Sequence, residues 1–332
     1  MIRNLFIHIG QFKTGSSSLQ ASFYFHRNYL KRSGILYPEE LENWHNHLYF
    51  SGNYTRMFPL WLEKKITEEE FFEKAEKSKN HILAQLAEQD YEKAIISSEE
   101  FCHFNDKSKL TELFSDLREI AKNIKIIIYL RHQMSHIDSA YKQRVLSRTE
   151  TRSFNAFFKE KMSKEDIEFD YKKILIEYAK IFGKENIIVR NFDSEHLIKT
   201  DVVSDFNKLL NIYMAYSENT KNISPSAQNT EFFRITQSAN SLDTISKQRI
   251  TRVLRRKKMK NISGAKYFYN EKQIKEVEDK FSEDNKFISK EFHFPILKLK
   301  KLEETEPFFE ASTAHTDKVA KFLSETLDAK NF

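Results

Sequence analysis

The sequence predicts an α/β protein in which helices flank a central parallel β-sheet. Short apolar runs rich in Ile and Val alternate with long helical patterns up to about residue 215, which is typical of such a sheet. Beyond that point the strand signals fade and only helical patterns remain. Apolar residues make up 40% of the chain and charged residues 31%, so there is enough apolar material for a core and disorder is excluded as the main state.

Four segments carry the pattern of strands, and they are Ile2–Ile9, Lys93–Ser97, Ile124–Leu130 and Asn186–Arg190. The helices predicted between and after them are Ser16–Arg32, Thr67–Glu88, Ser108–Lys122, Met134–Leu146 and Tyr171–Phe182. Thr67 and Glu70 have the spacing of a capping box, and Gly183 stands where a helix commonly ends.

The remainder of the chain predicts four further helices, at Glu231–Ala239, Asp243–Met259, Gln273–Phe287 and Asp317–Leu327. No internal repeat or strong linker divides the sequence. We therefore expect one domain over residues 1–332, with an α/β core at 1–215 and a helical C-terminal extension at 216–332.

Composition excludes several classes of protein. Only 6 Gly and 5 Pro occur in 332 residues, which rules out collagen-like and Pro-rich architectures. Cys102 is the single cysteine, so no disulfide can form within the chain, and a reducing compartment is expected. The longest apolar run in a predicted strand, Ile126–Leu130, is far shorter than the ~18 residues of a membrane span. We expect a cytoplasmic protein without a transmembrane segment.

The most informative segment lies between the first predicted strand and the first predicted helix. It holds two of the six glycines, Gly10 and Gly15, together with Lys13 and several hydroxyl side chains. A helix N-terminus offers free N–H groups and a favourable dipole to a phosphate. The glycine spacing resembles a P-loop, but Ser16 occupies the position where a nucleotide-triphosphate loop needs lysine. A purely structural turn is the alternative.

A second anion site is predicted at the end of the third strand, where Arg131 follows Leu130 directly and Ser139 comes eight residues later. Arginine presents several fixed N–H donors to a phosphate, and a strand end is where open α/β sheets bind ligands. The alternative is that Arg131 pairs with a surface carboxylate.

Together these segments resemble the sulfotransferase family that uses 3′-phosphoadenosine 5′-phosphosulfate (PAPS). The family's loop for the 5′-phosphosulfate reads roughly Lys-[Ser/Thr]-Gly-[Thr/Ser]-[Thr/Ser], and the chain matches it at Lys13, Thr14, Gly15, Ser16 and Ser17. The resemblance implies that Arg131 and Ser139 hold the 3′-phosphate, and Ser139-Ala140-Tyr141 matches the family's Ser-x-Tyr. One departure is Gln133, where the family often has Pro.

Looser matches to bacterial carbohydrate sulfotransferases occur along most of the chain, at 34–38, 182–192, 205–206 and around Asn285. The resemblance therefore implies a nucleotide donor as one partner and a glycan hydroxyl as acceptor, and the acceptor that it leads us to expect is a bacterial surface glycan or its precursor. It names no individual acceptor and no oligomeric state.

Sulfuryl transfer is an in-line displacement at sulfur, in which negative charge builds on the leaving oxygen. Lys13 is our candidate to stabilise that charge, and because no Asp follows the Ile-rich third strand, we expect no metal. The acceptor needs a base, for which we favour His47 and Glu99 while leaving His45 and Glu100 open. Trp44 and Tyr49 are candidates to stack on a sugar.

Two other functions compete with this interpretation. A P-loop kinase or NTPase would use ATP and magnesium, and the missing post-glycine lysine counts against it. A nucleic-acid-binding protein would use the basic run Arg252–Lys260, which has six positive charges in nine residues, but no recognised nucleic-acid motif accompanies the run, and we expect no nucleic-acid partner.

Overall fold

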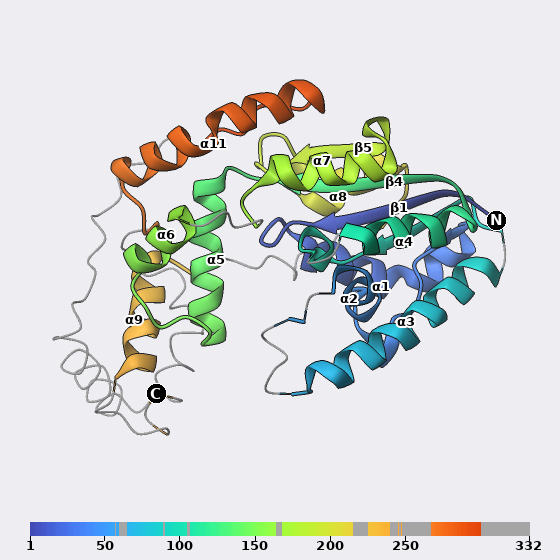
Figure 1. Cartoon of the computed structure of the whole chain (residues 1–332), viewed down its shortest axis with the longest axis horizontal. Helices are drawn as coiled ribbons and strands as arrows, with labels where there is room; N and C mark the ends of the chain where they lie inside the picture. The colour runs from blue at the N-terminus through green and yellow to red at the C-terminus, as the bar shows by residue number, and fades with distance from the viewer. Residues whose placement is uncertain are drawn as a thin grey trace. The chain divides into compact units, whose positions relative to one another are not determined.

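The computed structural model describes residues 1–56, 58–59, 65–88, 90–104, 107–163, 168–214, 225–239, 245, 247 and 267–299 (Figure 1). The chain divides into two compact units. The first comprises Met1–His132, Asp166–Lys221 and Phe281–Lys298, and the second comprises the remainder. The predicted helix at 317–327, the basic run 252–260 and all of the predicted 243–259 helix except Ile245 and Lys247 lie outside the described residues.

The first unit is built on a five-stranded sheet whose paired strands are all parallel. The strands follow the order β2-β3-β1-β4-β5, with bounds Ile35–Leu36, Lys93–Ser97, Ile2–Gly10, Ala121–Leu130 and Ile187–Asn191 respectively. In the middle of the sheet Ile7 stands opposite Ile96 on one side and Ile126 on the other. The predicted α/β class with a parallel sheet is confirmed.

Helices cover both faces of this sheet because successive side chains of a strand point to opposite faces. On β1, Leu5, Ile7 and Ile9 are buried in one apolar cluster and Phe6 in another. The first cluster also takes side chains from α2 (Leu48–Thr55), α3 (Glu68–Glu88), α4 (Lys107–Arg118) and α7 (Tyr171–Phe182). The second takes them from α1 (Ser16–Arg32) and α8 (Val202–Leu210).

Several predicted elements have the observed bounds, namely Ser16–Arg32, Lys93–Ser97 and Tyr171–Phe182. The helix predicted to continue to Lys122 ends at Arg118, because the chain enters β4 at Ala121. The capping box is confirmed: the N–H of Glu70 donates to Oγ1 of Thr67 at 3.1 Å, and the N–H of Thr67 donates to Oε2 of Glu70 at 2.8 Å.

Short elements escaped the sequence analysis. They are β2, α2, α8, α6 (Phe154–Ser163) and the 3₁₀ turns η1 (Leu41–Asn43), η3 (Glu99–Cys102), η4 (Lys184–Asn186) and η5 (Ile198–Thr200). Segments of two to ten residues leave too short a pattern for periodicity to reveal them.

In the second unit, aromatic rings of α5 (Gln133–Ser147) and α6 pack with Phe268, and α9 (Ala227–Ser238) contacts α5. The ring of Tyr141 lies 5.3 Å from that of Phe154 and 4.9 Å from that of Phe268. The predicted 273–287 helix is longer in the structure, where α11 runs from Glu271 to Glu291 and its residues belong to both units. No described helix is both long enough and apolar enough to cross a membrane. The division into a 1–215 core and a 216–332 extension stays a prediction.

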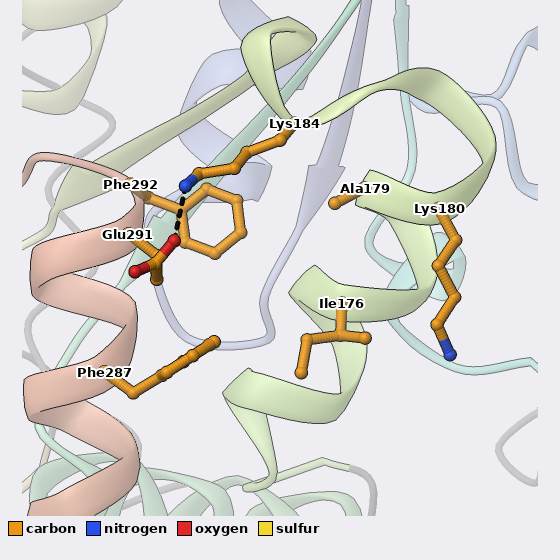
Figure 2. A pocket seen from close by; sticks show the side chains of 7 residues that line it. All are labelled: Ile176, Ala179, Lys180, Lys184, Phe287, Glu291 and Phe292. Atoms are coloured by element: carbon orange, nitrogen blue, oxygen red, sulfur yellow. Dashed lines mark hydrogen bonds and ion pairs between the residues drawn. The ribbon is translucent and has the colours of Figure 1, made fainter.

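A small pocket of about 260 Å³ lies between α7 and the C-terminal half of α11 (Figure 2). Its walls are mainly apolar, and Lys184 pairs with Glu291 at its rim. The pocket is beside the C-terminal end of α7. Because this end leads into the start of β5, it lies at the amino edge of the sheet. The loop after β1 is at the opposite, carboxyl edge, so this pocket is separate from the site described below.

Candidate functional site

The candidate site lies at the carboxyl ends of the three central strands. β1 ends at Gly10, β3 is followed by Glu99 in η3, and β4 is followed by Arg131. Because β3 and β4 pair with β1 from either side in parallel, the three segments leave the sheet at one edge. This edge is where open α/β sheets bind ligands.

The loop between β1 and α1, residues 10–15, is held in a tight conformation. Gly10, Lys13 and Gly15 have φ values of 75°, 65° and 78°, in the left-handed region. Oγ1 of Thr14 donates to the carbonyl of Gln11 at 2.6 Å, and the buried Gln11 amide donates to the carbonyl of Glu168 at 2.7 Å. The Thr14 hydroxyl therefore shapes the β1–α1 loop from within.

Gly10 and Gly15 allow other residues to approach the loop closely, in addition to adopting the left-handed backbone conformation. A Cβ at Gly10 would lie 2.6 Å from Cα of Glu99, and one at Gly15 would lie 2.8 Å from Cγ1 of Val202. Real side chains do not pack this closely, so glycine is required at both positions. The contact at Gly10 brings the backbone of Glu99 directly against the loop.

Helix α1 begins at this loop with features that favour an anion. Gly15 caps it without a side chain, and its first turn holds no acidic residue. The first N–H groups of a helix lack intrahelical partners and carry the positive end of the dipole. Ser16 is buried and Ser17 is exposed in that first turn.

Lys13 and Arg131 flank the start of α1. Nη1 of Arg131 donates to the carbonyl of Lys13 at 3.2 Å, while the buried Nε of Arg131 has no hydrogen-bond partner among the described residues. Burial and, to a smaller extent, the Arg131 charge lower the pKa of Lys13, and Glu99 opposes that shift. The charges of Arg131 and Glu99 thus both act on Lys13 in the β1–α1 loop.

Glu99 is half-buried and held by a neighbouring amide. Nε2 of the buried Gln20, on α1, donates to Oε2 of Glu99 at 2.6 Å and lies 3.3 Å from Oγ of Ser97. Ser97 in turn bonds Nδ1 of His8 at 2.8 Å, and burial lowers the pKa of His8 to about 3. The adjacent Glu100 is buried, which together with the charge of Glu99 raises its pKa to about 8.

His47 is engaged by the backbone on both sides of its ring. The N–H of Ser97 donates to Nδ1 at 2.9 Å, and Nε2 lies 3.1 Å from the carbonyl of Pro38. The side chain is 1% exposed, and burial lowers its pKa to about 4. Because both ring nitrogens are occupied, His47 ties the end of β3 to the segment after β2.

His45, by contrast, is exposed and belongs to an aromatic group with Tyr24 and Phe25. Its ring lies 4.2 Å from the ring of Tyr24 and 5.6 Å from that of Phe25, which is 72% exposed. Arg27 stacks over Tyr24 at 4.9 Å. The hydroxyl of Tyr37 donates to the carbonyl of His45 at 2.6 Å, and burial raises the pKa of Tyr37, with a contribution from Glu99.

The remaining candidates are placed as follows. Ser139 lies on α5 in the second unit and is 8% exposed. Tyr49 is 1% exposed, with its hydroxyl donating to Glu42 at 2.9 Å, so its ring is not open to a sugar. Trp44 is half-buried against the cluster of Leu48, Tyr49 and Phe71.

Sequence analysis missed Gln20 and the Tyr24–Phe25–His45 group. Gln20 is one polar residue on a helix, and only its i+4 offset from Ser16 in the first turn hints that it faces the sheet edge. Tyr24 and Phe25 meet His45 through tertiary structure, which no spacing rule reports. Within the described ranges, no group of three or more His, Cys, Asp or Glu side chains is arranged to bind a metal ion.

Comparison with known proteins found no matching family model and no matching curated protein. Three solved structures are similar in fold. The sulfotransferase from Alicyclobacillus acidocaldarius is 16% identical, with a TM-score of 0.46 and coverage of 88% of this chain and 96% of the other. The mouse sulfotransferase SULT7A1 complexed with PAP is 14% identical, with a TM-score of 0.39 and coverage of 86% and 85%.

The third is the sulfotransferase domain from the curacin biosynthetic pathway, which is 11% identical with a TM-score of 0.36 and coverage of 98% of both chains. Identities and TM-scores at this level are too low to transfer an activity.

Proposed function

We propose that the protein is a sulfotransferase that moves a sulfuryl group from PAPS to an acceptor hydroxyl. The observation that carries the proposal is the convergence of Lys13, Arg131 and Glu99 at the uncapped start of α1. Two cations suit the two phosphate ends of one nucleotide, and the carboxylate suits a hydroxyl that must lose a proton.

The described residues fit such a donor. The start of α1 supplies backbone N–H groups to the 5′-phosphosulfate, with Lys13, Thr14, Gly15, Ser16 and Ser17 as the proposed binding residues. In the part of the chain that the structure describes, the buried Nε of Arg131 has no hydrogen-bond partner, which is a costly arrangement unless a ligand supplies the acceptor. We assign Arg131 and Ser139 to the 3′-phosphate.

The chemistry follows from the charges at the loop. The acceptor oxygen forms a new bond to sulfur while the bond from sulfur to the bridging phosphate oxygen breaks, and that electron pair leaves with adenosine 3′,5′-bisphosphate. Lys13 stabilises the charge that builds on the leaving oxygen. Glu99 takes the proton of the acceptor hydroxyl, and we prefer it to His47 because the ring nitrogens of His47 are occupied. No metal is included in this mechanism.

A glycan is the acceptor class that we propose. The exposed rings of Phe25 and His45, with the half-buried ring of Tyr24, offer flat apolar faces, and the Arg27 guanidinium lies over Tyr24. Sugars present C–H faces and hydroxyl edges, which suit such a combination. Tyr37 links this group to the neighbourhood of Glu99 through its bond to His45. The cytoplasmic location stays a prediction.

The donor assignment is tested by thermal unfolding with adenosine 3′,5′-bisphosphate and, separately, with ATP plus magnesium. We expect the bisphosphate to stabilise the protein by ~2.7 kcal/mol at 100 times its Kd. Turnover is followed as bisphosphate released from PAPS, with water alone, dextran and chondroitin as acceptor probes. Stabilisation by ATP with magnesium and none by the bisphosphate would contradict the proposal.

Arg131→Met should weaken bisphosphate binding by about 10- to 100-fold, because a hydrogen bond to a charged group contributes roughly 1.5–3 kcal/mol. Calorimetric titration measures the change. The matched control is Arg3→Met, which removes an exposed arginine at the amino end of β1 and should leave the affinity unchanged. Equal affinities for Arg131→Met and the wild type would rule out the 3′-phosphate role of Arg131.

A further inference from the structure

The side chain of Glu99 is held by Gln20, a residue that has no role in the proposed mechanism. Gln20 is 4% exposed on α1, and its amide nitrogen lies 2.6 Å from Oε2 of Glu99. A carboxamide N–H can only donate, so Oε2 of Glu99 is the acceptor of this hydrogen bond. The same nitrogen lies 3.3 Å from Oγ of Ser97.

The backbone of Glu99 is fixed independently. The absence of a side chain at Gly10 lets Cα of Glu99 lie against the end of β1. Ser98 caps η3, with its hydroxyl accepting the N–H of Glu100 at 3.3 Å. With its backbone fixed, Glu99 can still change its side-chain rotamer. Gln20 is the described side chain that restrains this rotation.

The second contact of Gln20 is itself fixed within the sheet. This contact, Ser97, is buried and bonds Nδ1 of His8 at 2.8 Å. His8 stands opposite Ser97 in the pairing of β1 with β3. The amide is therefore attached to the two strands that deliver the β1–α1 loop and Glu99.

We propose that Gln20 is a positioning residue that holds the carboxylate of Glu99 toward Lys13 and the acceptor. The catalytic role of Gln20 rests on the proposed function. The effect of Gln20 on the position of Glu99 does not: without Gln20 the Glu99 carboxylate turns away from Lys13. Among the described residues, Arg131 from the end of β4 and Glu99 from η3 act electrostatically on Lys13.

The first test is a double-mutant cycle on bisphosphate release from PAPS, using Gln20→Met, Glu99→Gln and the double variant. Methionine keeps the size of glutamine and removes the donor. We expect Gln20→Met to lower the rate by about 10- to 100-fold, since a misplaced catalytic group costs on that order. The double variant should be no slower than Glu99→Gln alone. Additive losses in the cycle would overturn the inference.

The second test needs no turnover. Competitive acetylation of Lys13 by acetic anhydride across pH, read by mass spectrometry, reports the pKa of this lysine. Because Glu99 raises that pKa, Gln20→Met should lower it, Glu99→Gln should lower it equally, and the double variant should lower it no further. The control is Gln85→Met, since Gln85 bonds the backbone of Glu39 elsewhere on the surface.

The two failures are distinguishable. An unchanged Lys13 titration in Gln20→Met overturns the inference, whatever the enzyme does. A wild-type protein that neither binds the bisphosphate nor releases it from PAPS overturns the proposed function, and with it the catalytic meaning of Gln20. A lower melting temperature in Gln20→Met, with Lys13 titrating normally, assigns Gln20 a structural role only.

Discussion

Lys13→Met should lower the rate of bisphosphate release from PAPS by about 100- to 1,000-fold, the loss typical for removing one group that stabilises a developing negative charge. Methionine has nearly the length of lysine and the same backbone preference, so the variant removes the charge and little else. A rate within threefold of the wild type, with bisphosphate affinity intact, would contradict the assignment of Lys13.

The pH profile gives a second measure of the same residue. The amine of Lys13 can stabilise negative charge on the leaving oxygen only while it is protonated. Burial and the charge of Arg131 lower its pKa from the usual 10.5. The alkaline fall of kcat/KM should therefore lie below pH 10.5. Lys13→Arg retains its charge at every accessible pH, so its alkaline limb should move upward, at whatever rate the altered geometry allows.

Glu99→Gln should lower turnover by about 100- to 10,000-fold, the range for loss of a general base, and leave bisphosphate affinity close to that of the wild type. The amide is isosteric with the carboxylate and cannot accept the acceptor's proton. Rates of bisphosphate release with dextran and chondroitin, together with a calorimetric Kd, separate chemistry from donor binding.

The neighbouring Glu100 supplies a matched control for that experiment. Burial and the charge of Glu99 raise the pKa of Glu100 to about 8, so at pH 7 it is mostly uncharged already. Glu100→Gln exchanges one neutral side chain for another of the same shape and should retain most of the turnover. Full activity in Glu99→Gln combined with inactivity in Glu100→Gln would transfer the role of base to Glu100.

The sequence predicted the central part of the fold because its elements are long and strongly patterned. β1, β4, α1 and α7 bury regular apolar faces, and the predicted bounds agree with the structure to within a few residues. The edge strand β2 has only two residues, Ile35 and Leu36, and its pairing with β3 comes from tertiary structure. Short helices such as α2 are specified by packing more than by periodicity.

For the site, the sequence predicted that the segments after β1, β3 and β4 lie at one edge of the sheet, because the carboxyl ends of parallel strands share one edge. Glu99 and Arg131 follow β3 and β4, and both act on Lys13. The engagement of His47 by Pro38, nine residues before it, and by Ser97, 50 residues after it, could not be foreseen, since it depends on tertiary structure. The role proposed for Gln20 likewise depends on a helix lying against a strand end.

The left-handed backbone at Lys13 has a consequence for the evolution and engineering of this protein. An L-residue other than glycine costs roughly 1–2 kcal/mol in that conformation, and such strain is typical of functional sites. Selection for thermal stability alone would favour glycine at position 13, whereas selection for turnover would retain the ammonium. A library screened only for heat resistance should accumulate inactive variants at this position, and the opposing pressures mark it as a point of stability–activity trade-off.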